Sequence, residues 1–73
     1  MMSNEKLHNN QIGLRIRTAR KEKGINQTEL ANLLGKSLRT IQKYESGEIE
    51  VSIAMLNEIA KVFRLRIHIS YRV

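Results

Sequence analysis

Cysteine is absent from this 73-residue chain, which excludes a disulfide framework and a thiolate metal site. Long hydrophobic runs are absent too, because no apolar stretch approaches the roughly 20 residues that a membrane-spanning helix needs. The polar N-terminus is unlike a signal peptide, so we expect a cytoplasmic protein. A chain of this length forms one domain with a modest core, which association with a second copy would help to stabilise.

Patterns typical of catalysis and metal binding are also lacking. The two histidines, His8 and His68, lie in different segments, and neither is spaced from a carboxylate as metal ligands are. The sequence contains no glycine-rich phosphate loop and no nucleophile with a base nearby. We therefore predict that the protein is not an enzyme and needs no cofactor or metal.

Positive charge, in contrast, is plentiful, with a formal net charge of +6. Between Ile12 and Gly47 there are eight basic residues and only three acidic ones, so most of the excess lies in that segment. Such a concentration indicates a polyanionic partner. A merely solubilising surface is the alternative, and the pattern of residues 27–45 favours nucleic acid.

Residues 27–45 have the pattern of two short helices joined by a tight turn. Asn26 suits the N-cap of the first helix, because its side chain can accept an otherwise unpaired amide hydrogen. Gly35 suits a left-handed C-cap, and Ser37 can cap the second helix. A helix-turn-helix of this kind can place its second helix in the major groove of DNA.

Apolar spacing supports the same two helices. Leu30, Ala31 and Leu34 fall on one face of the first, and Ile41 and Tyr44 lie three apart on one side of the second. Ala31 is small enough to let the two helices cross closely.

Two further helices are predicted around this unit. One runs from about Gln11 to Lys23 and ends at Gly24, and its apolar stripe includes Ile12, Ile16 and Ala19. Leu14 lies off that stripe and is either an ordinary exposed leucine or a contact to another chain. The other helix runs from about Ser52 to Phe63. Its predicted core face comprises Ile53, Leu56, Ile59, Ala60 and Phe63, with Met55 and Val62 off that face.

The two ends of the chain are expected to differ from this helical body. Residues 1–10 are polar and are predicted to form a mobile arm, leaving 11–63 as the DNA-binding domain. In residues 64–73 the hydrophobic period changes to two, which predicts a strand. A lone strand leaves its backbone unpaired, so the simplest partner is the same strand of a second copy; a disordered basic tail is the alternative. The predicted dimerisation residues are Leu65, Ile67, Ile69, Tyr71 and Val73.

Several motifs in step carry a family resemblance. They are Gly24-Ile25-Asn26-Gln27-Thr28-Glu29-Leu30-Ala31, Gly35, Thr40-Ile41 and Tyr44-Glu45-Ser46-Gly47. Together they resemble the phage-repressor and Cro-like helix-turn-helix domains of the XRE family. The resemblance covers about residues 12–63 and implies a mainly α fold of four to five helices. The predicted terminal strand departs from that family and is similar to HipB-type antitoxins, which share such a strand across a dimer.

The resemblance also assigns roles to individual residues. It pairs Arg20 with Glu45, which would tie the first helix to the second helix of the motif. With Ile41 and Tyr44 pointing inward, the predicted base-contacting residues are Leu38, Arg39, Gln42 and Lys43. Arg39 is expected to hold O6 and N7 of guanine, as arginine commonly does. The predicted phosphate-contacting residues are Asn26, Gln27, Lys36, Ser37 and Thr40, although Ser37 alternatively serves only as a cap.

We therefore predict a homodimer that binds double-stranded operator DNA in a sequence-specific manner, most simply as a repressor. One alternative is an antitoxin that also binds a toxin, which the terminal strand suggests. Another is a protein-interaction adaptor that has kept the fold without binding DNA. Glu48 and Glu50 motivate the adaptor, because they would repel phosphates, unless they instead interact with the positive end of the last helix.

Overall fold

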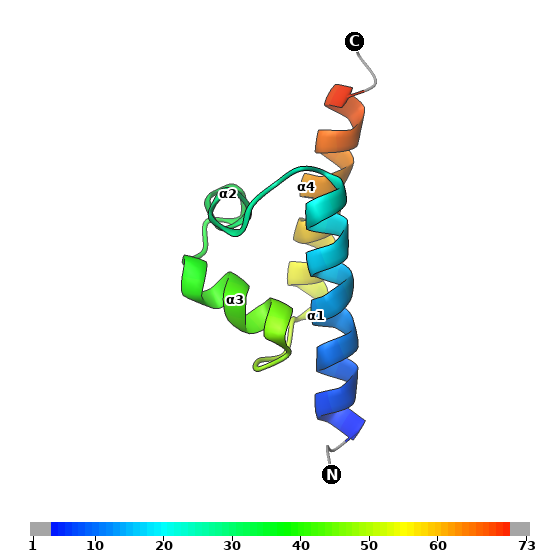
Figure 1. Ribbon diagram of the computed structural model, residues 1–73, viewed down its shortest axis with the longest axis vertical. Helices are drawn as coiled ribbons and strands as arrows, with labels where there is room; N and C mark the ends of the chain where they lie inside the picture. Colours follow the sequence, from blue (N-terminus) through cyan, green and yellow to red (C-terminus); the bar gives the residue numbers. More distant parts are fainter. Residues whose placement is uncertain (1–3, 71–73) are drawn as a thin grey trace.

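Four helices make up the described part of the chain. The computed structural model (Figure 1) describes residues 4–70, with residues 4, 6 and 65–70 described by their backbone alone. The elements are α1 (Asn4–Glu22), α2 (Gln27–Leu34), α3 (Leu38–Ser46) and α4 (Ile53–Ser70). Helices α1 and α4 lie side by side and run in the same direction, and α2 and α3 lie to one side of them (Figure 1). The predicted mainly α helix-turn-helix fold is confirmed.

Local capping fixes the bounds of α2 and α3. The side chain of Asn26 accepts a hydrogen bond from the Glu29 N–H at 2.8 Å, and the Glu29 carboxylate accepts one from the Asn26 N–H at 2.9 Å. This reciprocal pair is a capping box. Gly35 ends α2 with a φ of 66°, and the Ser37 hydroxyl begins α3 by accepting a hydrogen bond from Thr40 N–H. These caps agree with the prediction from the sequence.

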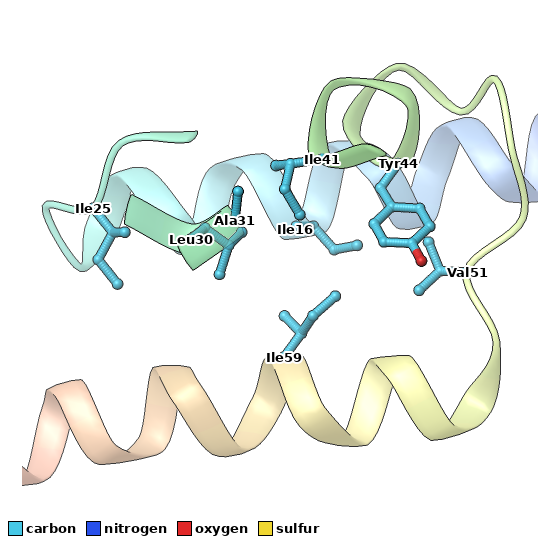
Figure 2. Close-up of a cluster of buried hydrophobic side chains, with 8 residues drawn as sticks. All are labelled: Ile16, Ile25, Leu30, Ala31, Ile41, Tyr44, Val51 and Ile59. Atoms are coloured by element: carbon cyan, nitrogen blue, oxygen red, sulfur yellow. The ribbon is translucent and has the colours of Figure 1, made fainter. Parts of the chain in front are cut away.

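One hydrophobic core joins the helices. Leu30 and Ile41 are its most enclosed members, with exposed fractions of 0% and 1%. Ile25 and Val51 also belong to it, although they come from connecting segments, where no helical period could indicate burial. Figure 2 shows the cluster, which consists of Ile16, Ile25, Leu30, Ala31, Ile41, Tyr44, Val51 and Ile59.

Two glycines let α1 approach α3 closely. A Cβ atom built on Gly13 would stand 2.5 Å from the carbonyl oxygens of Tyr44 and Glu45. At the end of α3, a Cβ on Gly47 would lie 2.8 Å from the Cα of Asn10. Neither contact was predicted from the sequence, because Gly13 belongs to no apolar stripe.

The start of α1 differs from the prediction. The helix begins at Asn4 rather than near Gln11, so residues 4–10 belong to α1. Asn10, the last residue of this extra length of helix, lies against Gly47 at the C-terminal end of α3. Residues 1–3 lie outside the described residues.

The end of α4 is a second correction. A strand was predicted from residue 64 onward, but the backbone remains helical through Ser70. A helix pairs its backbone N–H and C=O groups within the segment, whereas a lone strand leaves them unpaired. The dimerisation role proposed for Leu65, Ile67 and Ile69 concerns side chains outside the description. Tyr71 and Val73 lie wholly outside the described residues.

The buried face of α4 also differs from the predicted one. Ile53 is 79% exposed and Ala60 is exposed, although both were assigned to the core. Val51 occupies the core position beside Tyr44 just before the helix begins (Figure 2). The side chains of α4 that do pack on the core are Met55, Leu56, Ile59, Val62 and Phe63.

Candidate nucleic-acid interface

Helix α3 divides its residues between the core and solvent. Ile41 and Tyr44 are buried, at 1% and 9% exposed. Leu38, at 41%, is exposed, as are Arg39 and Gln42. Lys43 shares this outer side and is half-buried. The four residues predicted to contact bases therefore lie on the accessible side of a helix whose other side is anchored in the core.

A shallow groove lies along that outer side. It has a volume of about 320 Å³ and is lined by Arg39, Gln42, Lys43, Ser46 and Glu48. Sequence reasoning missed Ser46 and Glu48 as members of this surface. The position of Ser46, two helical turns after Arg39, was the available signal for it. The groove combines two cationic side chains, an amide, a hydroxyl and a carboxylate, which together match the donors and acceptors of base edges.

The N-terminal end of α3 carries the next group of predicted contacts. Lys36 is exposed in the turn before the helix. The hydroxyl oxygens of Ser37 and Thr40 are 3.0 Å apart, and the Ser37 oxygen also accepts the Thr40 N–H at 3.1 Å. Ser37 therefore acts as a cap, and its contact with phosphate stays a prediction. Free N–H groups at a helix start attract anions, so the position suits a phosphate.

The start of α2 is more fully engaged in contacts within the protein. The Asn26 side chain and backbone N–H both belong to the capping box with Glu29. Gln27 Nε2 donates a hydrogen bond to Glu45 Oε1 at 3.0 Å. Since an amide NH₂ has two hydrogens, Gln27 retains one for another acceptor. Phosphate contacts by these two residues stay predictions.

An ion pair beneath the interface holds α3 in place. Arg20 Nε donates to Glu45 Oε2 at 2.6 Å, and Arg20 Nη2 donates to Glu45 Oε1 at 3.1 Å. The two side chains are only 8% and 4% exposed. Arg20 Nη1 also donates to the Ile25 carbonyl oxygen at 2.8 Å. Together with the bond from Gln27, these contacts tie α1, the loop after it and α2 to the end of α3. The resemblance pairs Arg20 with Glu45, but the contributions of Ile25 and Gln27 were not foreseen.

Neither a metal site nor a membrane-spanning helix is found among the described residues. No group of three histidine, cysteine, aspartate or glutamate side chains, among the side chains that the structure describes, lies close enough to hold a metal ion. None of the helices in that range is long and apolar enough to span a membrane.

Comparison with known proteins gives consistent matches. Residues 16–69 match the helix-turn-helix family model HTH_3. Over 51 residues, 41% are identical to a Pyrococcus furiosus protein named as an HTH-type transcriptional regulatory protein, covering 70% of this chain and 16% of that protein. A Pyrococcus horikoshii protein of the same description is 39% identical over 51 residues, with the same two coverages. An uncharacterized HTH-type transcriptional regulator of Sinorhizobium fredii is 35% identical over 54 residues, covering 74% of this chain and 38% of that protein. The chain thus spans about a sixth of the length of these Pyrococcus relatives.

Proposed function

Since this chain belongs to the helix-turn-helix family HTH_3, we propose that it regulates transcription by sequence-specific binding to double-stranded DNA. The observation that carries this proposal is the accessible side of α3, where Arg39, Gln42 and Lys43 line one groove. The relatives named as transcriptional regulators support the same function. In the proposed complex, α3 lies in the major groove with this side against the base edges.

Each side chain on that surface has a chemically suitable target. Arg39 can donate two hydrogen bonds to guanine O6 and N7, and Gln42 can pair with N6 and N7 of adenine. Leu38 has no hydrogen-bonding group and suits a thymine methyl. Lys43, as a single cation on a flexible stem, suits a guanine acceptor or a nearby phosphate.

The proposed phosphate contacts lie at the starts of the two motif helices. Lys36, Ser37 and Thr40 gather at the start of α3, and Asn26 and Gln27 lie at the start of α2. Both helices direct the positive ends of their dipoles to these positions, which favours an anion there. Gln27 would then bridge a phosphate and Glu45, so that the network of Arg20 also orients a DNA contact.

We propose further that the protein binds as a homodimer and represses transcription. Two copies would contact half-sites about one helical turn apart on a pseudo-palindromic operator. A small domain gains both stability and affinity from such pairing. The proposal no longer depends on a strand, because the segment after Arg64 is helical as far as Ser70.

The antitoxin alternative loses its support. It was based on a terminal strand shared between two copies, and the helical backbone of residues 65–70 removes that argument. We therefore propose no toxin partner. The adaptor alternative makes a distinct prediction, since an adaptor would not depend on the base-facing side chains of α3.

Replacing Arg39 tests the proposal. Binding-site selection with the unaltered protein should give a defined sequence, and Arg39→Ala should lose about 1–3 kcal/mol of discrimination at one base pair per half-site. Arg17→Ala, which removes the same charge from an exposed position on α1, is the matched control and should keep the full preference. Selection of no sequence by the unaltered protein, or equal behaviour of the two variants, would contradict the proposal.

A further inference from the structure

We propose that Glu48 determines specificity by accepting a hydrogen bond from the N4 amino group of a cytosine in the major groove. This inference rests on the proposed DNA-binding function. It adds a residue outside α3, the helix proposed to contact the bases. On charge alone, Glu48 would be expected to weaken binding, because a carboxylate repels phosphates. Its place in the structure points to a base edge instead.

The backbone of Glu48 is tied to α3 by hydrogen bonds. Its N–H donates to the Lys43 carbonyl oxygen at 3.0 Å and lies 3.3 Å from the Ser46 hydroxyl. The Gly47 before it has a φ of 79°, the left-handed conformation that ends a helix and turns the chain back. The Glu48 backbone is therefore part of the α3 cap, so Glu48 stays next to the outer side of α3 when α3 docks.

The Glu48 side chain shares the groove with the residues proposed to contact bases. Arg39 and Lys43 line the same hollow of about 320 Å³. Among the residues that the structure describes, no ion pair or hydrogen bond engages the Glu48 carboxylate. Both cations are likewise without an acidic partner within that part of the chain. The groove thus offers donors and a strong acceptor together, all of them available to a ligand.

The chemistry of base edges selects the target. In the major groove only cytosine N4 and adenine N6 offer hydrogens, whereas guanine O6 and thymine O4 would repel a carboxylate. Adenine N7 is an acceptor next to N6, so it repels the second carboxylate oxygen. Cytosine has a C–H group at the corresponding place. A carboxylate therefore favours cytosine, and the paired guanine presents its acceptors to a cation such as Arg39 or Lys43.

A matched pair of variants tests this inference. Glu48→Ala and Glu50→Ala each remove one negative charge from the same exposed loop, but Glu50 does not line the groove. Binding of the full chain would be measured on an operator set in which each base pair is changed in turn. The unaltered protein should prefer cytosine at one position per half-site by about 5- to 150-fold. Glu48→Ala should lose that one preference and keep the others, and Glu50→Ala should keep all of them.

Glu48→Gln provides a second test, in which the base preference is expected to change rather than disappear. The amide is neutral and can pair with both N6 and N7 of adenine, so the preference at the same position should move from cytosine to adenine. Circular dichroism should show the same helix content in all variants, because both glutamates are exposed.

Two other outcomes would overturn the inference in distinguishable ways. If Glu48→Ala and Glu50→Ala raise affinity equally for every sequence, the carboxylate only repels the backbone, and the proposed function stands without this contact. If the unaltered protein prefers no sequence at all, the proposed function itself fails and this inference fails with it.

Discussion

Arg20 shows how one buried charge can organise a small fold. It is 7% exposed, and a lone buried guanidinium would be strongly unfavourable. Its cost is offset because three of its nitrogens donate hydrogen bonds, two to Glu45 and one to the Ile25 carbonyl oxygen. The charge-assisted bonds run in parallel between two planar groups, which fixes direction as well as distance. This geometry sets the angle of α3 relative to α1.

Removing Arg20 alone should be severely destabilising. In Arg20→Met, Glu45 would keep only the hydrogen bond from Gln27 and would be left as a buried, uncompensated carboxylate. We expect a loss of about 3–5 kcal/mol in the free energy of unfolding, measured by urea denaturation. Arg17→Met, on the exposed side of α1, should change it by less than about 0.5 kcal/mol.

The double variant Arg20→Met, Glu45→Met separates charge compensation from packing. Replacing both charges with apolar side chains removes the uncompensated carboxylate, so most of the lost stability should return. Equal unfolding free energies for Arg20→Met and Arg17→Met would show that the pair behaves as an exposed one.

At this scale the sequence predicted burial and one long-range pair, but not the other partners of that pair. The resemblance paired Arg20 with Glu45, and helical spacing correctly placed Ile41 and Tyr44 inside. The sequence did not predict that Gln27 donates a hydrogen bond to Glu45. The two residues are 18 positions apart, and their contact depends on the angle between two helices. The position of Glu48 in the groove was missed for a similar reason, because the turn at Gly47 sets the direction of the chain there.

At the scale of elements, the predicted bounds were correct where interactions between residues close in the sequence determine them. Asn26, Gly35 and Ser37 fixed the bounds of α2 and α3, since capping bonds form between residues a few positions apart. The start of α1 was missed because Asn4–Asn10 carries almost no apolar signal. There the helix is supported by Asn10 packing on Gly47, a contact between distant parts of the chain.

The end of α4 was missed for a different reason. Alternating apolar residues from Leu65 onward match a strand period, but a period describes side chains and not the pairing of the backbone. The described chain provides no neighbouring strand within residues 4–70. Continuing the helix satisfies each N–H with a carbonyl four residues back, and adding a residue to an existing helix is easier than nucleating a new element.

Ser37 permits a test that separates capping from DNA contact. Ser37→Ala removes the acceptor of the Thr40 N–H and should cost about 1 kcal/mol of stability. Ser37→Asp keeps an acceptor and places a negative charge at the positive end of the α3 dipole, so its stability should match or exceed that of the unaltered protein. Thermal unfolding measures both effects.

The same two variants should rank in a different order when their DNA affinity is measured. If a phosphate lies at the start of α3, the aspartate repels it, so Ser37→Asp should bind DNA more weakly than Ser37→Ala despite being more stable. Should the two variants rank in DNA affinity as they rank in stability, Ser37 is a cap and nothing more.

On the scale of the whole molecule, α1 and α4 form a long pair, and the motif helices lie on one side of it (Figure 1). This arrangement leaves the outer side of α3 accessible. The C-terminal end of α3 packs closely on α1, where Gly13 lies against Tyr44 and Glu45 and Gly47 lies against Asn10. Of the net charge of +6, most lies between residues 12 and 47. The backbone-binding part of the affinity should therefore fall steeply with added salt.

Assembly gives the last test, because a single copy presents only one α3 to DNA. Ending the chain at Arg64 removes the residues that the sequence predicted for dimerisation but keeps the core residues of α4 as far as Phe63. We expect this shortened protein to sediment as a monomer and to bind an operator about 10²–10⁴-fold more weakly, since linked half-sites multiply affinity by that order. A chain ending at Ser70 is the matched control and tests residues 71–73 separately.

If the chain ending at Arg64 still sediments as a dimer, the pairing surface lies elsewhere. The exposed Leu14, at 61%, would then be the next residue to replace, because it is a large apolar side chain facing solvent on α1.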